Sequence, residues 1–247
     1  MNINKQILSN ISEIENRKRF YELYSINPLP EDEVLTNLGL FINRQTLSRI
    51  IFMNELYQKI VNVHGVVMEF GVRWGQNLAL FESFRGMYEP FNFTRKIIGF
   101  DTFEGFPTIH EKDGNLNKIN DYSVTDGYEK YLEKILQYHE NESPISHIKK
   151  FELIKGDATK TLAKYLEKNP ETLIAFAYFD FDLYEPTKAC LQLIKDRLVK
   201  GSIIGFDELN HPKFPGETLA FMEVLGANNY TLHRSILSPY MSYVIIR

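Results

Sequence analysis

Cysteine is almost absent from the sequence, since Cys190 is the single one among 247 residues. One cysteine excludes an intramolecular disulfide and a zinc site built from several cysteines, and it fits the reducing cytoplasm. Basic residues are not in excess either: 28 Lys and Arg against 32 Asp and Glu give a formal net charge of -4. Because nucleic acid is bound by basic surfaces, we expect no nucleic-acid partner.

Long hydrophobic runs are also missing. The longest stretches, such as LIAFAYF (173–179), reach about seven residues, whereas a membrane-spanning helix needs about 20. The N-terminus, MNINKQILSNISEIENRKRF, is polar and has no apolar core of the kind found in a signal peptide. We therefore expect a cytoplasmic protein without a membrane partner. The 18 Phe and 14 Tyr supply ample apolar surface for a folded core.

The apolar residues that are present indicate an α/β fold. Between residues 44 and 63 they recur every three or four positions, as in an amphipathic helix. Five short apolar runs, each closed by Gly or an acid, are typical of strands buried on both faces. These predicted strands are 65–71, 96–101, 151–157, 173–182 and 201–207. Predicted helices over 77–88, 158–168 and 186–198 separate them, which favours a doubly wound, mostly parallel sheet.

The remaining segments complete the predicted organisation. Residues 1–43 read as an N-terminal helical extension, and residues 44–247 as one α/β domain. Within that domain the polar, partly helical segment 108–150 is expected to form an insertion over the active site. Residues 230–234 and 242–247 are expected to close the sheet as a strand pair, because the chain ends without a further helix.

Acidic residues stand at the ends of the predicted strands. They are Glu69, Asp101, Asp157, Asp180 with Asp182, and Asp207 with Glu208. Strand ends often carry Asp as a turn residue, so any one of these acids alone has a structural explanation. Ligands of open α/β sheets, however, bind beyond the carboxyl ends of the strands. The whole set therefore predicts a binding crevice along this edge.

The turn after the first strand predicts the cofactor. Gly71 permits a tight turn, and Gly75 allows a ligand to approach the backbone where the next helix begins. The spacing G-x-x-x-G differs from the G-x-G-x-x-G of dinucleotide sites, and 32 residues separate Glu69 from Asp101 instead of the roughly 20 of a nicotinamide site. A cofactor with adenosine but no pyrophosphate, S-adenosylmethionine, fits this pattern.

The later acids predict a metal site. Asp180 and Asp182 are two apart on a predicted strand, so both should point to one face, next to Asp207 and Glu208. Carboxylates this close repel one another unless they are protonated or neutralised by a cation. Oxygen ligands favour Mg²⁺, Mn²⁺ or Ca²⁺ over zinc. The alternative is a solvated acidic rim that bonds to loop backbone.

Five segments together resemble the macrocin O-methyltransferase family, whose members are class I methyltransferases that methylate sugar hydroxyls of natural products. The segments are EFGVRWGQN (69–77), GFDTFEGFP (99–107), KGDA (155–158), FDFDLYEPTK (179–188) and GFDEL (205–209). The resemblance implies a seven-stranded sheet with an antiparallel C-terminal strand, S-adenosylmethionine, Mg²⁺ or Mn²⁺, a sugar-containing substrate and a homo-oligomer.

The resemblance also implies roles for individual residues. The methionine end of the cofactor falls to Glu69, Gly71, Arg73, Gly75 and Asn77, the ribose to Asp101, Thr102 and Phe103, and the adenine to Asp157 and Ala158, with Asp180 beside the cofactor. The metal ligands implied are Asp180, Asp207 and Glu208. Asp182 matches the position proposed as general base in some members. His211, which follows the acidic pair, is the rival, because its ordinary pKa near 6.5 suits a base.

Two other functions stay open at this point. A nicotinamide-dependent dehydrogenase could use the same kind of sheet, although the glycine spacing and the distance to Asp101 argue against it. A regulatory domain could bind a nucleotide or sugar without chemistry, although four acids at 180, 182, 207 and 208 argue against that. The predicted function is thus a metal-dependent sugar O-methyltransferase.

Overall fold

The computed structural model describes residues 9–247; residues 1–8 of the predicted N-terminal extension lie outside this range. The chain divides into two compact units, one ending at Ser48 and the other beginning at Arg49. The first unit contains α1 (Ile11–Ser25), α2 (Glu31–Thr36) and a short 3₁₀ turn (Leu38–Leu40). Helix α1 begins with a capping box between Asn10 and Glu13, which satisfies two backbone N–H groups. The extension is therefore helical, as predicted. Helix α3 (Arg44–Ile60) runs from this unit into the second.

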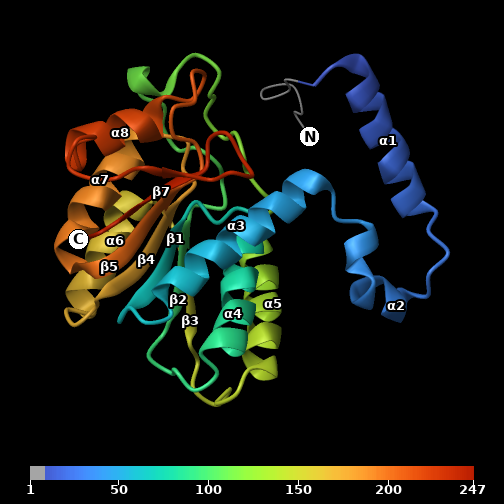
Figure 1. Ribbon diagram of the computed structural model, residues 1–247, viewed down its shortest axis with the longest axis horizontal. Coiled ribbons are helices and arrows are strands. Elements are labelled where there is room, and N and C mark those ends of the chain that lie inside the picture. Colours follow the sequence, from blue (N-terminus) through green and yellow to red (C-terminus); the bar gives the residue numbers. More distant parts are fainter. Residues whose placement is uncertain (1–8) are drawn as a thin grey trace. The chain divides into compact units, whose positions relative to one another are not determined.

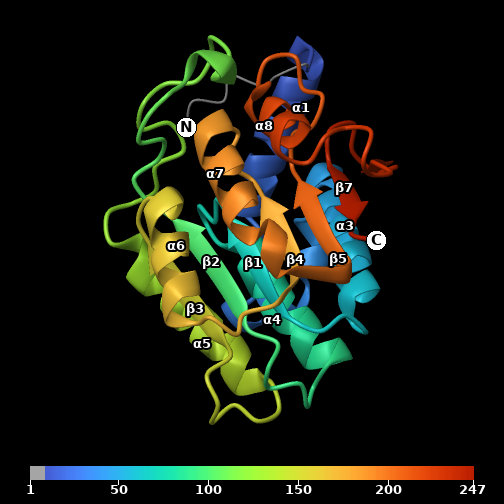
Figure 2. The same ribbon diagram turned by 90° about the vertical axis from the view of Figure 1, so that its left-hand side faces the viewer.

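Within residues 9–247 the second unit holds a seven-stranded sheet with the order β3-β2-β1-β4-β5-β7-β6 (Figure 2). The strands are β1 (Val66–Phe70), β2 (Ile97–Asp101), β3 (Phe151–Lys155), β4 (Ile174–Phe179), β5 (Leu198–Phe206), β6 (His233–Arg234) and β7 (Ser242–Ile245). The first five pair in parallel, β7 runs antiparallel to β5, and β6 runs antiparallel to β7. This order confirms the predicted doubly wound, mostly parallel sheet with its antiparallel C-terminal strand.

Helices cover both faces of the sheet (Figure 1). One layer consists of α3 from Arg49 onward, α4 (Gln76–Tyr88) and α5 (Tyr128–Glu142); the other consists of α6 (Ala158–Lys168), α7 (Tyr184–Ile194) and α8 (Gly216–Val224). Successive strand residues point to opposite layers, so Val67 packs with the first and Met68 with the second. Side chains on both faces of the sheet are buried, which explains why the strands read as nearly continuous apolar runs.

The segment 108–150 includes a 3₁₀ turn (Glu111–Asp113) and the whole of α5. Helix α5 packs against α4 and β3, and its Leu132 and Leu136 are buried in the core. It is thus the crossover helix between β2 and β3 and belongs to the sandwich itself. The remaining loop residues, 108–127, are the part of this segment for which a cover over the active site stays a prediction.

The end of β4 differs from the sequence-based expectation. The strand stops at Phe179, so Asp180 and Asp182 do not share a strand face; both lie in the loop before α7. Asp182 adopts a left-handed backbone with φ of +59°. The N–H groups of Phe181 and Asp182 both bond to the carboxylate of Glu217 in α8, which draws the chain away from the sheet. Helix α7 begins at Tyr184, two residues before the predicted start, with Pro186 in its first turn.

In the described part of the chain, no helix combines the length and the apolar character that crossing a membrane requires.

Candidate active site

The site lies where the strand order reverses, between β1 and β4. The two strands lead to helices on opposite faces, and their ends come so close that only glycine fits at position 71. A Cβ on Gly71 would lie 2.1 Å from the carbonyl oxygen of Asp180, and the residue has a φ of +92°. Gly75 starts α4 with a φ of +79°, and a Cβ there would lie 2.3 Å from Leu132. The backbone conformation and the packing against α5 thus both favour glycine at position 75, and its approach to a ligand stays a prediction.

A buried carboxylate stands beneath this turn. Glu69 is 1% exposed, and its Oε1 accepts a 2.7 Å hydrogen bond from Nδ2 of Asn77. Its Oε2 is buried and has no hydrogen-bond partner among residues 9–247. Burial raises the pKa of Glu69 well above its ordinary value, although the bond from Asn77 opposes this shift. A buried acceptor without a partner costs about 1–3 kcal/mol, so Oε2 is suited to a donor or cation on a ligand.

Asp101 is held by the two turns on either side of it. Its Oδ2 accepts the N–H of Arg73 at 2.8 Å, and its Oδ1 accepts the N–H of Phe103 at 2.5 Å. Both donors have left-handed backbones, with φ of +50° and +59°, a strain of roughly 1–3 kcal/mol each that is typical of ligand clamps. Burial raises the pKa of Asp101 above its ordinary value, although the hydrogen bonds from the backbone N–H groups of Arg73 and Phe103 oppose this shift. Each carboxylate oxygen can still accept a further bond, as two ribose hydroxyls would require.

Other predicted cofactor residues use their polar groups inside the protein. The hydroxyl of Thr102 donates to the carbonyl of Gly105 at 2.8 Å and holds the following turn. Asp157 caps α6 and accepts bonds from the N–H and the hydroxyl of Thr159. Partial burial works to raise the pKa of Asp157, but the bonds from Thr159 and Lys160 outweigh it and lower this pKa. The carboxylate of Asp157 is therefore committed to the helix, while Ala158 begins α6 and is buried.

Next to the turn, the loops after β4 and β5 bring several acids together. Burial raises the pKa of Asp180 to about 7, and the charge of Asp207 adds to this effect. Burial also raises the pKa of Asp182 well above its ordinary range, with Asp180 and Asp207 contributing, and raises that of Glu208 to about 10. The predicted metal ligands and the predicted base thus share one buried acidic site.

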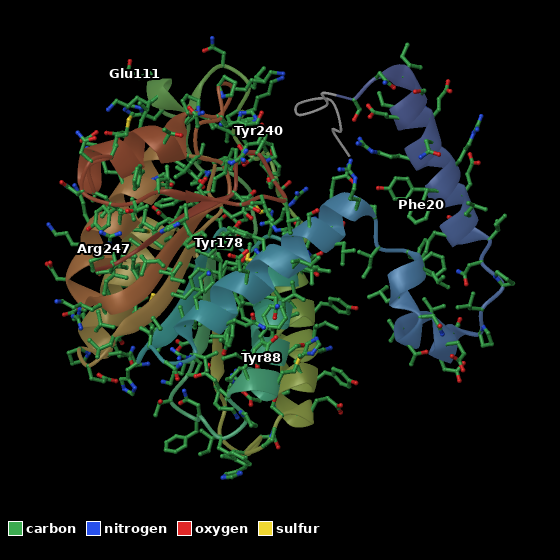
Figure 3. All side chains as sticks on the ribbon, viewed as in Figure 1. Phe20, Tyr88, Glu111, Tyr178, Tyr240 and Arg247 are labelled. Atoms are coloured by element: carbon green, nitrogen blue, oxygen red, sulfur yellow. The ribbon has the colours of Figure 1, made fainter. Side chains whose placement is uncertain are left out.

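Arg49 provides the positive charge in this cluster. Its Nη2 pairs with Asp180, its Nη1 lies 2.8 Å from Oδ1 of Asp207, and its Nε donates to Oδ1 of Asn77 at 3.3 Å. Tyr178, labelled in Figure 3, lies on the sheet face that α3 covers and donates its hydroxyl to Asp207 at 2.7 Å. As the side chains stand, no three His, Cys, Asp or Glu of the described residues converge as a metal-binding group.

Glu217 in α8 organises both acidic loops. It is fully buried, and its Oε1 accepts the N–H groups of Phe181 and Asp182, while its Oε2 accepts that of Glu208 at 3.2 Å. Gly216 before it has no room for a side chain, since a Cβ would lie 2.6 Å from the backbone nitrogen of Tyr184. The start of α8 therefore fixes the positions of the loops after β4 and β5 relative to each other.

His211 is buried against aromatic rings. Its ring centroid lies 4.2 Å from that of Tyr240 and 4.9 Å from that of Phe214, and Nδ1 accepts the N–H of Lys213. Burial lowers the pKa of His211, and Lys213 adds to this effect. With Nδ1 engaged as an acceptor, the neutral ring carries its proton on Nε2 and has no lone pair left for a substrate proton.

The loop 102–127 and the first residue of α5 each place a tyrosine against the turn between β1 and α4. The guanidinium of Arg73 stacks on the ring of Tyr122 at 4.9 Å, and the ring of Trp74 meets that of Tyr128 edge-on at 4.7 Å. The hydroxyl of Tyr128 also donates to the carbonyl of Trp74. The bulky residues Arg73 and Trp74 are thus explained by their packing against this loop and the first residue of α5.

A scan of protein-family models finds no match, and a search of curated proteins finds none either. Among solved structures, the chain is similar to the calicheamicin methyltransferase CalS11, with 40% identity, a TM-score of 0.93, and coverage of 99% of this chain and 96% of that one. An apo structure of CalS11, described as a TDP-rhamnose 3'-O-methyltransferase of calicheamicin biosynthesis, is 39% identical, covers 99% of both chains and has a TM-score of 0.86. The chain belongs to the sugar O-methyltransferase family of CalS11. The chain is also similar to the O-methyltransferase NovP, with 16% identity, a TM-score of 0.60, and coverage of 81% of this chain and 79% of that one. At this identity the similarity shows the fold alone.

Membership of the CalS11 family confirms that this chain is an O-methyltransferase, and it fits the resemblance to macrocin O-methyltransferases. The dehydrogenase alternative is therefore wrong. The site of this methyltransferase nevertheless contains Arg49 and Glu217, which the sequence analysis missed. A signal for both exists: Arg49 shares a helix face with the buried Phe52, Met53 and Leu56, and Glu217 shares one with Ala220 and Phe221. A charged residue on the apolar face of a helix indicates a buried polar site.

Proposed function

We propose that the protein transfers a methyl group from S-adenosylmethionine to a hydroxyl of a nucleotide-linked deoxysugar, with the help of a divalent cation. The observation that carries the cofactor assignment is the buried Glu69, whose Oε2 stands without a partner in the described chain next to Asn77 and Asp101. Glu69 would face the positively charged methionine end, and Asp101 would accept the ribose hydroxyls. Gly71, Arg73, Gly75, Thr102, Phe103, Asp157 and Ala158 would shape the rest of this pocket.

Asp180, Asp207 and Glu208 would hold the cation. Their donors are all carboxylate oxygens, the kind that Mg²⁺ and Mn²⁺ prefer, and their mutual repulsion calls for positive charge. Arg49 now supplies that charge to two of them, so its guanidinium would have to move. When bound, the cation would orient two neighbouring sugar hydroxyls and lower the pKa of the reacting one.

We assign the role of general base to Asp182. Its raised pKa, which burial causes, makes this carboxylate a better proton acceptor than an ordinary aspartate. His211 is disfavoured because Nδ1 is already engaged by Lys213. Asp182 would take the hydroxyl proton while the sugar oxygen attacks the methyl carbon; the carbon–sulfur bond breaks, and its electron pair stays on sulfur.

The choice of a nucleotide-linked sugar follows from the family. CalS11, the similar methyltransferase, is described as a TDP-rhamnose 3'-O-methyltransferase. We infer the same class of substrate here, because the two chains are 39% identical over 99% of both.

The proposal keeps three expectations from the sequence. The reaction would take place in the cytoplasm, where a buried free thiol such as Cys190 stays reduced. The protein would work as a homo-oligomer, as the resembling family does. Neither nucleic acid nor a membrane would take part.

A methyl-transfer screen tests the proposal. Purified protein with methyl-labelled S-adenosylmethionine and Mg²⁺ is offered TDP-rhamnose, other TDP-deoxysugars and the corresponding free sugars, and methylated products are identified by mass spectrometry. Transfer to at least one TDP-deoxysugar, lost after exhaustive chelation and restored by Mg²⁺ or Mn²⁺, is the expected result. Transfer that persists after chelation would remove the cation from the proposal, and transfer to free sugars alone would remove the nucleotide.

A further inference from the structure

Arg49 occupies an unusual position for a charged residue of a helix. Its guanidinium lies between two carboxylates from different strand ends, Asp180 after β4 and Asp207 at the end of β5. The side chain keeps 27% of its surface exposed, and its tip lies 5.9 Å above the ring of Tyr178. One planar group thus makes two charge-assisted hydrogen bonds, each with a different nitrogen.

The same two carboxylates are proposed as ligands of the divalent cation. The guanidinium of Arg49 holds one oxygen of each carboxylate, Oδ2 of Asp180 and Oδ1 of Asp207. A divalent cation that bound these oxygens, at about 2.0–2.1 Å for Mg²⁺, would compete with the guanidinium for them. As the side chains stand, no three acids of the described residues converge as a metal-binding group. The residues therefore fit a cation in their chemistry, but two of them are now paired with Arg49.

We propose that Arg49 is a tethered cation that competes with the divalent cation for the carboxylates of Asp180 and Asp207. The inference rests on the proposed function of this site and adds how the site is regulated. In the metal-free protein Arg49 neutralises the two acids, and it must leave for the divalent cation to enter. Apparent affinity for the divalent cation is then weaker than the carboxylates alone would give.

Displacement of Arg49 would also affect the turn between β1 and α4, where the cofactor is proposed to bind. Its Nε donates to Oδ1 of Asn77, and Nδ2 of Asn77 donates to Glu69. A continuous chain of hydrogen bonds therefore joins the proposed cation site to Glu69, the buried carboxylate that is proposed to face the cofactor. Arg49 is a positioning residue in this scheme, because it acts through Asn77 and the two aspartates.

Direct binding of Mn²⁺ tests the competition. The paramagnetic resonance signal of free Mn²⁺ reports binding without any need for turnover, in wild type and in Arg49→Met, a variant of similar length without the charge. Because two charged hydrogen bonds no longer oppose the metal, Arg49→Met should bind Mn²⁺ about 10 to 100 times more tightly. Arg49→Lys keeps the positive charge but lacks the two guanidinium nitrogens that reach separate carboxylates, so its Mn²⁺ affinity should fall between those of the wild type and Arg49→Met. Equal or weaker binding by Arg49→Met would overturn the proposal.

Two controls keep the test decisive. Asp207→Asn in the Arg49→Met background should abolish the gain in Mn²⁺ affinity, because Asp207 is a proposed ligand of the cation. If the double variant keeps the whole gain, the Mn²⁺ binds elsewhere and the inference is contradicted. If Arg49→Met fails to fold, as circular dichroism would show, the wild type is titrated with Mg²⁺ and the Nε–H signal of Arg49 is followed by NMR, with Arg49→Lys as the assignment standard. A shift of that signal toward free arginine is expected, and an unchanged signal at saturating Mg²⁺ would overturn the proposal. Calorimetry with S-adenosylmethionine and the methyl-transfer screen on the same samples show separately whether the proposed function holds.

Discussion

At the scale of single residues, Asp101 combines two tasks in one carboxylate. It fixes two strained backbone turns through the N–H groups of Arg73 and Phe103, and it keeps acceptor capacity for a ligand. Asp101→Asn replaces one oxygen with an amide that faces a backbone donor and cannot accept a hydroxyl. We expect this variant to bind S-adenosylmethionine more weakly by about 1–3 kcal/mol, as measured by calorimetry.

Glu104→Gln is the matched control for Asp101→Asn. It makes the same kind of change, from a carboxylate to an amide, three residues away at a side chain that is 77% exposed. The affinity of this control should stay within roughly twofold of the wild type, the usual range for a substitution away from a ligand. Unchanged affinity in a folded Asp101→Asn variant would refute the ribose assignment.

The proposed base is open to a second test at this scale. Asp182→Asn should lower kcat by about 10²–10⁴, the range for a lost acid–base group, while calorimetry shows almost unchanged binding of S-adenosylmethionine. The wild-type rate should rise with pH as Asp182 loses its proton, and the variant should lack this limb of the profile. His211→Gln serves as the comparison, since a histidine with its Nδ1 engaged is not expected to accept the proton. If His211→Gln loses most of its kcat while Asp182→Asn keeps it, the base is His211.

At the scale of elements, the acidic loops depend on the first turn of α8. Glu217 accepts three backbone N–H groups, from Phe181, Asp182 and Glu208, and no other described side chain joins the two loops in this way. Glu217→Gln turns one acceptor into a donor that faces the N–H of Glu208. We expect a loss of about 1–3 kcal/mol in the free energy of unfolding, measured by urea denaturation, and a lower kcat with little change in cofactor affinity.

Glu223→Gln on the same helix is the control for Glu217→Gln. Glu223 is 43% exposed, pairs with Lys188 and Lys112, and accepts the hydroxyl of Tyr184, a bond that the carbonyl oxygen of a glutamine can also accept. Surface ion pairs contribute about 0–1 kcal/mol, so this control should change stability little and leave kcat unchanged. Equal effects of the two substitutions would mean that Glu217 does not organise the loops.

The elements also show what the sequence could and could not predict. Strands and crossover helices follow from local apolar periodicity, and all five predicted parallel strands are present within residues 9–247. The end of β4 was misplaced because Asp180 and Asp182 alternate with Phe179 and Phe181 like strand residues. What ends the strand is Glu217, a hydrogen-bond acceptor 35 and 36 residues away in the chain. The partners of a contact this long leave no local pattern; the local sequence marks Arg49 and Glu217 only as charged residues on apolar helix faces, without saying which acids or loops they contact.

At the scale of the whole molecule, the fold concentrates negative charge where the proposed chemistry needs it. The packed strands and helices are apolar on both faces, whereas Asp180, Asp182 and Glu208 are collected at the edge with raised pKa values. Burial and mutual repulsion disfavour the charged forms of these acids in the folded protein. Such an arrangement stabilises the protonated folded state and makes the site a source of instability at neutral pH.

The pH dependence of stability should reveal this cost. A carboxylate whose pKa is raised by folding contributes stability below its unfolded pKa of about 3.9, and this contribution is lost as pH rises toward the folded pKa. The pKa of Asp182 is shifted in this direction by burial and by Asp180. Asp182→Asn should therefore be more stable than the wild type at pH 8, by about 1–3 kcal/mol or a few degrees in Tm, and gain little near pH 4.

Thermal melts at both pH values measure the difference. The control is Asp196→Asn, at an exposed surface position, which should give the same small change at each pH. A gain from Asp182→Asn that is as large at pH 4 as at pH 8 would show that its charge is not the cause, because the carboxylate and the amide differ in charge only when the acid is ionised.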